Sequence, residues 1–256
     1  CRHLILLTGE SQEHSPLEYI VESINTIKEY FPSITMEVWP MTVNQYKEVV
    51  KAGAEGLTIY QETYDEKVYD EMHLAGPKKN YKFRLDGPER GAMAGMKSIS
   101  IGALLGLADF RKDALASALH VYYLQRKYPY AEYSLSCPRL RPIINNDRIN
   151  PLDVGERQLC QVLCAYRIFL PYVGITVSSR EQKHFRDGIV KIAATKVSAG
   201  VSTGIGDHES KYTGKDNGNT GDEQFEISDG RSFDQMYADM TDEGMQPVLN
   251  DYVYVG

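Results

Sequence analysis

Gly56-Leu-Thr-Ile-Tyr-Gln-Glu-Thr-Tyr64 is a short apolar run that finishes in five consecutive side chains capable of hydrogen bonding. The apolar part predicts a strand, whereas a strand that only filled a core would not need the polar end. Six further short apolar runs recur along the chain, and nearly every one ends in polar or charged residues: residues 4–10, 34–41, 98–106, 133–142, 174–181 and 196–204. In a parallel β/α barrel the carboxyl ends of all strands open on one face, which carries the active site. The repeated polar endings therefore predict an active site divided among strand ends.

Helical segments separate these runs. Ser15-Pro16-Leu17-Glu18 predicts a helix start in which Ser15 is the N-cap and Glu18 completes a capping box. Similar starts recur at Thr42 with Gln45, Asp86 with Glu89, Asp153 with Glu156, Ser179 with Gln182, and Ser232 with Gln235. Gly53 and Gly95 stand where left-handed residues would end two of the helices.

Alternating strands and helices indicate an α/β fold with a mostly parallel sheet. Seven strands favour a TIM-barrel-like (β/α) fold, and a doubly wound sheet remains an alternative because periodicity cannot show closure. Residues 204–230 are rich in Gly, Asp, Asn and Ser and predict a long loop, either a lid over the barrel mouth or an inert excursion. We expect a barrel over residues 1–205 and a loop-and-helix extension packed on it over residues 206–256.

The composition excludes several classes of protein. With a formal net charge of −7 and no Lys/Arg-rich stripe, the chain is not expected to bind nucleic acid. No apolar stretch approaches the roughly 20 residues of a membrane span, and no signal peptide is visible, so we expect no membrane association and a cytoplasmic location. The four cysteines are too few and too scattered for a secreted disulfide framework.

Two strand ends early in the chain carry candidate binding residues. Thr8-Gly9-Glu10 combines a backbone that a ligand can approach closely with a carboxylate that can accept from an ammonium group. In the run from Tyr60 to Tyr64, Glu62 would be costly in a barrel interior without a partner, and Arg84 is the candidate partner. A turn with a solvated charge and an ordinary ion pair are the plainer alternatives.

The later strand ends are basic. Residues 136–142 (SCPRLRP) present Arg139 and Arg141, which suit anion recognition or could clamp acidic loops at the rim. Ser179 and Arg180 lie beside a predicted helix N-terminus, which suits an anionic group, and Ser179 is also expected to be the N-cap. Cys160 and Cys164 lie four residues apart in a predicted helix, where packed core cysteines are the better interpretation than a metal site.

At TGE, YQETY, FRLDGPER, IGALLGL, SCPRLRP and SSRE, the chain resembles the radical S-adenosylmethionine (SAM) tyrosine lyases, most of all the branch of thiamine thiazole biosynthesis. The resemblance implies that Thr8, Gly9 and Glu10 hold the methionyl amine of SAM, that Glu62 contacts its ribose or amine, and that Arg84 contacts its carboxylate. It further implies that Arg180 binds the carboxylate of the substrate tyrosine, assisted by Ser198.

The reaction that the resemblance implies begins with a 4Fe-4S cluster that reduces SAM. The resulting 5'-deoxyadenosyl radical leads to Cα–Cβ cleavage of tyrosine into 2-iminoacetate (dehydroglycine) and p-cresol, with thiazole synthase as an implied partner. The chain departs from the family because it contains no C-x-x-x-C-x-x-C motif. We therefore expect it to be a C-terminal part of a longer protein, with the first barrel strand and cluster loop upstream of Cys1, and to be inactive alone.

Other functions remain open at this stage. The tyrosine lyase of iron-only hydrogenase maturation is the nearest alternative, and the absence of any cysteine after Cys164 favours the thiamine branch over it. A barrel-like binding module that never held a cluster is an alternative without catalysis. A barrel enzyme with a Schiff-base lysine is less well supported, because Lys196 lies at the wrong end of its strand.

Overall fold

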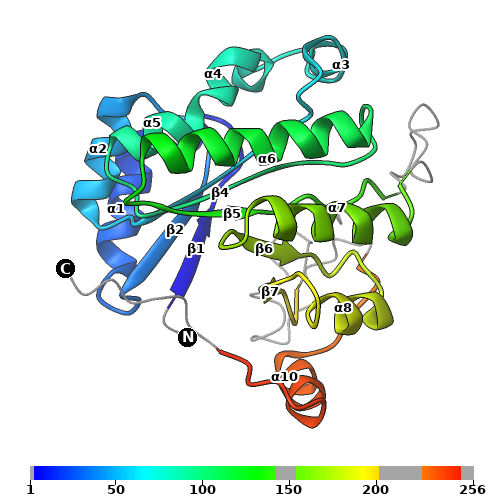
Figure 1. The fold of residues 1–256 in the computed structure, drawn as a ribbon. Coiled ribbons are helices and arrows are strands. Elements are labelled where there is room, and N and C mark those ends of the chain that lie inside the picture. Colours follow the sequence, from blue (N-terminus) through cyan, green and yellow to red (C-terminus); the bar gives the residue numbers. More distant parts are fainter. Residues whose placement is uncertain (1–2, 142–153, 202–226, 249–256) are drawn as a thin grey trace, which may run out of the picture.

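A computed structural model describes residues 3–141, 154–201 and 227–248 of the chain. Seven parallel strands form one sheet, in which each strand pairs with the next strand of the sequence (Figure 1). They are β1 (His3–Leu7), β2 (Ser33–Glu37), β3 (Gly56–Glu62), β4 (Ser98–Ala103), β5 (Glu132–Leu135), β6 (Gly174–Val177) and β7 (Lys196–Val197). Each begins within one residue of the predicted start, and the polar ends lie mostly beyond the paired residues.

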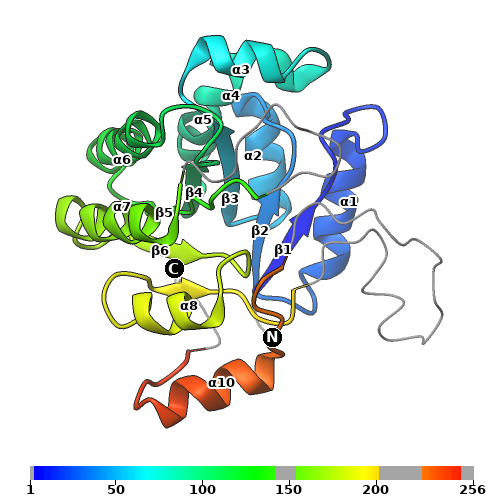
Figure 2. The same cartoon turned by 90° about the vertical axis from the view of Figure 1, so that its right-hand side faces the viewer.

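The sheet curls, and helices cover its outer side (Figure 2). These helices are α1 (Leu17–Ile27), α2 (Val43–Ala52), α5 (Gly87–Met93), α6 (Phe110–Lys127), α7 (Glu156–Phe169) and α8 (Lys183–Ile189). Three short elements follow the carboxyl end of β3: α3 (Glu66–Met72), the 3-10 turn η1 (Pro77–Lys79) and α4 (Tyr81–Leu85). The last described helix, α10 (Phe233–Asp242), lies beyond α8.

The predicted incomplete β/α barrel is confirmed. Among the described strands β1 pairs only with β2 and β7 only with β6, so the sheet is open. The core lies between the sheet and its helices, and its largest fully buried apolar side chains include Trp39, Tyr46 and Met36. Removing such a side chain from water contributes about 1.5–3 kcal/mol. Gly102 is required where β4 meets β5, because a Cβ there would lie 1.9 Å from the carbonyl oxygen of Ser136.

Some predicted helix starts are confirmed. Thr42 and Ser232 each accept a hydrogen bond from the backbone N–H three residues later and complete capping boxes. The box at Ser15 is wrong: Pro16 is the extended N-cap residue of α1, and no side chain caps it. The carbonyl of Ser15 instead accepts from Nε1 of Trp39 at 2.9 Å, so a tertiary contact orients this end.

Other helix boundaries follow the predictions in part. Asp86 precedes α5 but makes no capping hydrogen bond, because the chain passes into α5 directly from α4. Gly53 (φ 130°) and Gly95 (φ 97°) have the expected positive φ after α2 and α5. The helix start predicted at Asp153 with Glu156 is wrong, because α7 begins at Glu156 with Gly155 as its N-cap and Gln158 as the partner. Residues 204–226 of the predicted loop lie outside the described residues, and so does residue 205, where we expect the barrel to end, so that division stays a prediction. No helix in the described ranges is long and apolar enough to cross a membrane.

Candidate functional site

Glu10, Glu62 and Arg84 come from three separate segments and meet at the carboxyl end of the sheet. Nη1 of Arg84 donates to both carboxylate oxygens of Glu10 at 2.8 Å, and Nη2 lies 3.6 Å from Oε1 of Glu62. Nε of Arg84 donates to the carbonyl of Tyr60 at 2.6 Å. The Arg84 side chain is only 6% exposed, so it forms the centre of a nearly buried ion-pair cluster. The predicted Glu62–Arg84 pair is present, with Glu10 as the closer partner.

Glu62 has an uncommon backbone conformation. Its φ is 70°, and it is the one residue other than glycine with positive φ in the described part of the chain. The pairing with β4 shifts register between Tyr60 and Glu62, and the carbonyl of Glu62 accepts from Leu104 N at 2.8 Å. Such a conformation costs about 1–3 kcal/mol and persists where surrounding structure imposes it, often at functional sites. Here it ends β3 with the Glu62 carboxylate in the charged cluster.

Two residues that the sequence analysis did not single out belong to the same cluster. Nζ of Lys78 lies 2.6 Å from Oε1 of Glu62 and 3.7 Å from Oε1 of Glu10. Burial raises the pKa of the Glu37 carboxyl, and the negative charge of Glu62 raises it further. Glu37 is the only charged residue in its apolar run, which was a usable signal, whereas nothing in the sequence distinguished Lys78 from the adjacent Lys79.

Thr8 and Gly9 border this cluster from β1. The backbone N–H of Thr8 donates to the carbonyl of Glu37 at 3.3 Å, which ties the end of β1 to β2. A Cβ placed on Gly9 would meet nothing within 4 Å. The backbone at Gly9 therefore faces open space beside Glu10, as an approach by a ligand requires.

Arg180 follows the carboxyl end of β6 (Gly174–Val177). Burial lowers the pKa of its guanidinium, and the negative charge of Glu62 opposes that shift. The charge of Glu62 therefore acts on Arg180, whose place in the site stays a prediction.

The turn at Ser178–Arg180 is held from two sides. The N–H of Ser179 donates to Oγ of Ser198 at 3.1 Å, and its carbonyl accepts from the N–H groups of Ser228 and Asp229 at 3.0 and 3.1 Å. The expectation that Ser179 is a helix N-cap is wrong, because α8 starts at Lys183 with Gln182 as its N-cap. The tertiary contacts use the backbone of Ser179 instead, and the hydroxyl of Ser198 helps to fix the residue before Arg180.

A buried ion-pair network lies behind this turn. Arg186 is fully buried (0% exposed), and its Nη1 donates to Oδ2 of Asp229 at 2.5 Å, while Nη2 donates to the carbonyl of Ser198. Arg231 donates to both carboxylate oxygens of Asp229. Burial alone would raise the pKa of Asp229, but hydrogen bonds from Arg231 and the charge of Arg186 outweigh it and lower the pKa to about 2. We call Arg186, Asp229 and Arg231 the C-terminal network.

Of the two alternatives for Arg139, clamping the rim is correct. Nε of Arg139 donates to both carboxylate oxygens of Glu181 at 2.9 and 3.1 Å, and Nη1 donates to the carbonyl of Val154 at 3.0 Å. Glu181 is 1% exposed, so this pair is a structural element of the rim. Nη2 of Arg141 donates to Oγ of Ser228 at 2.8 Å and so contacts the segment that holds Ser179.

No metal centre is evident in the described residues, where no three His, Cys, Asp or Glu side chains lie close enough together to hold an ion. Cys160 and Cys164 are free thiols on α7, partly buried against the core, which agrees with packing rather than ligation.

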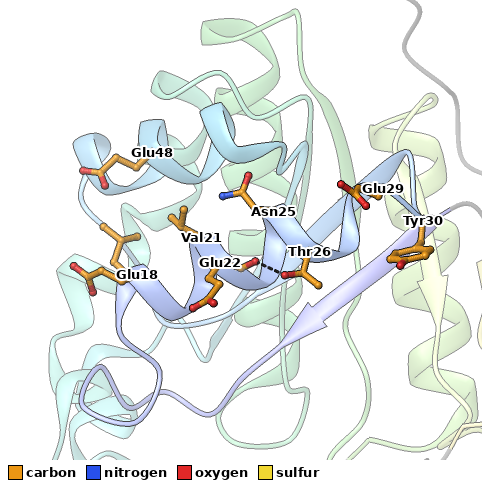
Figure 3. Close-up of a pocket in the computed structure, with 9 residues that line it drawn as sticks. Glu18, Val21, Glu22, Asn25, Thr26, Glu29, Tyr30 and Glu48 are labelled. Atoms are coloured by element: carbon orange, nitrogen blue, oxygen red, sulfur yellow. Dashed lines mark hydrogen bonds between the residues drawn. The ribbon is translucent and has the colours of Figure 1, made fainter.

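An acidic groove on α1 lies apart from the strand ends. Figure 3 shows Glu18 and Glu22 along the outer face of α1, Glu29 in the turn that follows it, and Glu48 of α2 nearby. Thr26 uses its hydroxyl to donate to the carbonyl of Glu22 at 2.9 Å, as residues on an exposed helix face often do. None of the candidate binding residues lines this groove, and we do not assign it to the site.

Comparisons with known proteins point to one group. Residues 136–246 match the family described as "Biotin and Thiamin Synthesis associated domain". The 2-iminoacetate synthase of Escherichia coli K12 is 37% identical over 252 residues, and that of Salmonella typhimurium is 36% identical. Each alignment covers 98% of this chain and 64% of the relative, so the chain spans less than two thirds of these proteins. The resemblance to tyrosine lyases is confirmed at this level.

Solved structures support the same grouping. A crystal structure of HydG, a maturase of the [FeFe]-hydrogenase, is 30% identical with a TM-score of 0.84 and covers 95% of this chain and 53% of HydG. HydG from Carboxydothermus hydrogenoformans is 31% identical, with a TM-score of 0.85 over 99% of this chain and 57% of HydG. Methylornithine synthase (PylB), at 17% identity and a TM-score of 0.69, shares the fold.

Proposed function

From its similarity to the 2-iminoacetate synthases over nearly its whole length, we propose that this chain supplies the SAM- and substrate-binding part of a radical SAM tyrosine lyase. The whole enzyme would cleave the Cα–Cβ bond of tyrosine to give 2-iminoacetate and p-cresol for thiamine thiazole synthesis. A cytoplasmic location and thiazole synthase as partner belong to the same proposal and rest on the resemblance alone.

The observation that carries the proposal is the convergence of charged groups at one end of the sheet. Glu10, Glu62 and Arg84 meet there in direct ion pairs. An amino acid and SAM both carry an ammonium and a carboxylate, which need acceptors and donors of this kind. An inert barrel module would have no need to bury these charges at a strained strand end.

The residues of this chain fit SAM in chemistry. The carboxylates of Glu10, Glu37 and Glu62 can accept hydrogen bonds from an ammonium and from ribose hydroxyls, and the open backbone at Gly9 leaves room beside them. Arg84 is held by Glu10 and by the carbonyl of Tyr60, so its assignment to the SAM carboxylate requires a rearrangement of the Glu10 contact. The cysteine ligands of the 4Fe-4S cluster do not come from this sequence, which contains no C-x-x-x-C-x-x-C motif.

SAM and a 4Fe-4S cluster, when bound, would supply the radical chemistry of cleavage. The part of this chain in the reaction is then to bind, orient and shield the reactants. In the proposal Arg180 binds the carboxylate of tyrosine, and Ser198 acts through the Ser179 backbone to fix the position of Arg180.

A chimaera tests the function. The segment of E. coli 2-iminoacetate synthase that aligns with this chain is replaced by residues 1–256, and the protein is reconstituted anaerobically with iron and sulfide. We expect p-cresol and deoxyadenosine from tyrosine and SAM. Absorption and electron paramagnetic resonance spectra verify that the 4Fe-4S cluster is intact. If the chimaera then forms deoxyadenosine but no p-cresol, tyrosine is not the substrate.

The same chimaera tests the substrate residue. Arg180→Ala should weaken tyrosine binding by about 1.5–3 kcal/mol, the loss of a hydrogen bond to a charged group. Arg157→Ala, which removes an exposed arginine of α7, is the matched control and should leave tyrosine binding unchanged. Equal tyrosine affinity in the two variants would remove Arg180 from the site.

A further inference from the structure

Lys78 is the member of the strand-end cluster that no sequence motif accounts for. Its Nζ lies 2.6 Å from Oε1 of Glu62 and 3.7 Å from Oε1 of Glu10. One ammonium group thus contacts carboxylates from the ends of two different strands. The Lys78 ammonium is placed where a ligand that brings its own ammonium would find both acceptors.

The backbone that carries Lys78 is fixed. The hydroxyl of the buried residue Tyr69 donates to the Lys78 carbonyl at 2.5 Å. Gly76 (φ 74°) makes the turn into η1, and the side chain of Asn80 caps α4 directly after it. Because both flanks are anchored, the Lys78 ammonium can leave the carboxylates by rotation of its side chain alone.

The two cations that contact Glu10 and Glu62 within the described residues differ in how firmly they are held. Arg84 is nearly buried and also donates to the Tyr60 carbonyl at 2.6 Å. Lys78 has a flexible four-carbon stem and a side chain that is 32% exposed. Lys78 can therefore move into solvent at little cost, whereas Arg84 cannot.

The carboxylates outnumber these cations. Glu10, Glu37 and Glu62 lie close enough together that Glu62 and Glu10 both raise the pKa of Glu37. Without Lys78, three carboxyl groups would remain with two guanidiniums: that of Arg84, which pairs with Glu10 and Glu62, and that of Arg180, on which the charge of Glu62 acts. The local charge therefore favours the arrival of a cation whenever Lys78 departs.

We propose that Lys78 is a place-holder: its ammonium fills the subsite on Glu62 and Glu10 that the α-ammonium of SAM takes on binding, and SAM displaces it into solvent. The choice of SAM as the ligand rests on the proposed function. Removal of the Lys78 ammonium should consequently strengthen binding of SAM. If Lys78 instead bound the carboxylate of SAM, its removal would weaken the binding of SAM, which is the opposite result.

The ligand-free chain tests the contact itself. A brief reaction with an acetylating reagent, read by mass spectrometry, compares labelling of Lys78 with that of the exposed neighbour Lys79. We expect Lys78 to react about fivefold more slowly than Lys79, and Glu62→Gln to remove most of that difference, because a surface ion pair is worth at most about 1 kcal/mol. Equal labelling in the unmodified chain would overturn the proposal.

The chimaera described above tests the displacement. We expect Lys78→Met to lower the Kd of SAM about fivefold, a gain of about 1 kcal/mol, and Lys79→Met to leave it unchanged. SAM should also increase the acetylation of Lys78 relative to Lys79. Unchanged or weaker SAM binding by the Lys78 variant, or protection of Lys78 by SAM, would overturn the place-holder while leaving the proposed function intact. Absence of SAM binding in every variant would instead refute the proposed function, and the place-holder with it.

Discussion

The strand-end cluster and the C-terminal network are both built from buried charges, but their charge balances differ. In the C-terminal network two guanidiniums surround Asp229, and the pKa of that carboxyl falls to about 2. In the strand-end cluster, burial raises the pKa of Glu37, and the negative charges of Glu62 and Glu10 raise it further. In the first arrangement the Asp229 carboxylate is paired by guanidiniums of the chain itself, whereas the second arrangement gains from an added cation. We call a network saturated when the cations of the chain match its carboxylates. A saturated network suits a structural role, whereas a cluster with surplus carboxylates suits the binding of a cation.

The largest effect is expected from breaking the saturated network. Asp229→Ala would leave the guanidinium of Arg186, which is fully buried, without its carboxylate, so we expect a loss of about 3–5 kcal/mol in the free energy of unfolding. Urea denaturation of the 256-residue chain measures it.

Asp239→Ala is the matched control for this change. Asp239 also pairs with Arg231, but its side chain is 39% exposed, so its loss should destabilise the chain far less than the loss of Asp229. Equal losses in the two variants would mean that the network is no more saturated than an ordinary surface pair.

The stability of the chain should also depend on pH through the titration of Asp229 in the C-terminal network. Its pKa in the folded state, about 2, lies below the ordinary value of 3.8, so its contribution to stability is fully present above about pH 4 and is lost as the pH falls through 2. The lost contribution is about 2 kcal/mol. Urea midpoints between pH 5 and pH 2 should therefore fall less steeply in Asp229→Asn than in the unmodified chain. Parallel pH profiles would show that Asp229 does not titrate as its contacts imply.

The smallest expected effect is a gain in the free energy of unfolding, and it comes from a residue of the strand-end cluster. Because burial and the charge of Glu62 raise the pKa of Glu37, its ionised form opposes folding at neutral pH, and Glu37→Gln should stabilise the chain slightly at pH 7. That gain should disappear as the pH falls through the raised pKa, where Glu37 becomes neutral. Glu29→Gln, an exposed change in the turn after α1, should alter stability by less than about 0.5 kcal/mol. If Glu37→Gln destabilised the chain instead, ionised Glu37 would not be unfavourable beside the other carboxylates of the cluster.

Prediction from sequence worked where the determinants are local. The alternation of apolar runs and helices located every strand to within one residue of its start, because burial and periodicity act over a few residues. Capping at Thr42 and Ser232 was likewise predicted, since both partners of each box lie three residues apart. Prediction failed at Ser15 and Ser179, where contacts with Trp39 and with Asp229 decide the local geometry.

The candidate site shows the same division. Glu10, Glu62, Arg84 and Arg180 were singled out from strand-end positions and family resemblance, and the fold joins the first three in ion pairs. Lys78 was missed because a lysine in a loop looks the same whether its ammonium points to solvent or to Glu62. Glu37 carried a weak signal, a lone charge in an apolar run, which only its burial beside other carboxylates makes meaningful.

By itself, the sequence determined the order of strands and helices, the parallel sheet and the set of polar groups at the strand ends, because these depend on patterns that span few residues. The tertiary structure decided which of those groups pair, which arginines are structural, and that the strand ends hold more carboxylates than contacting cations. Those outcomes depend on distances between residues such as Glu10 and Arg84, far apart in the chain, and Coulomb energies follow the separation in space.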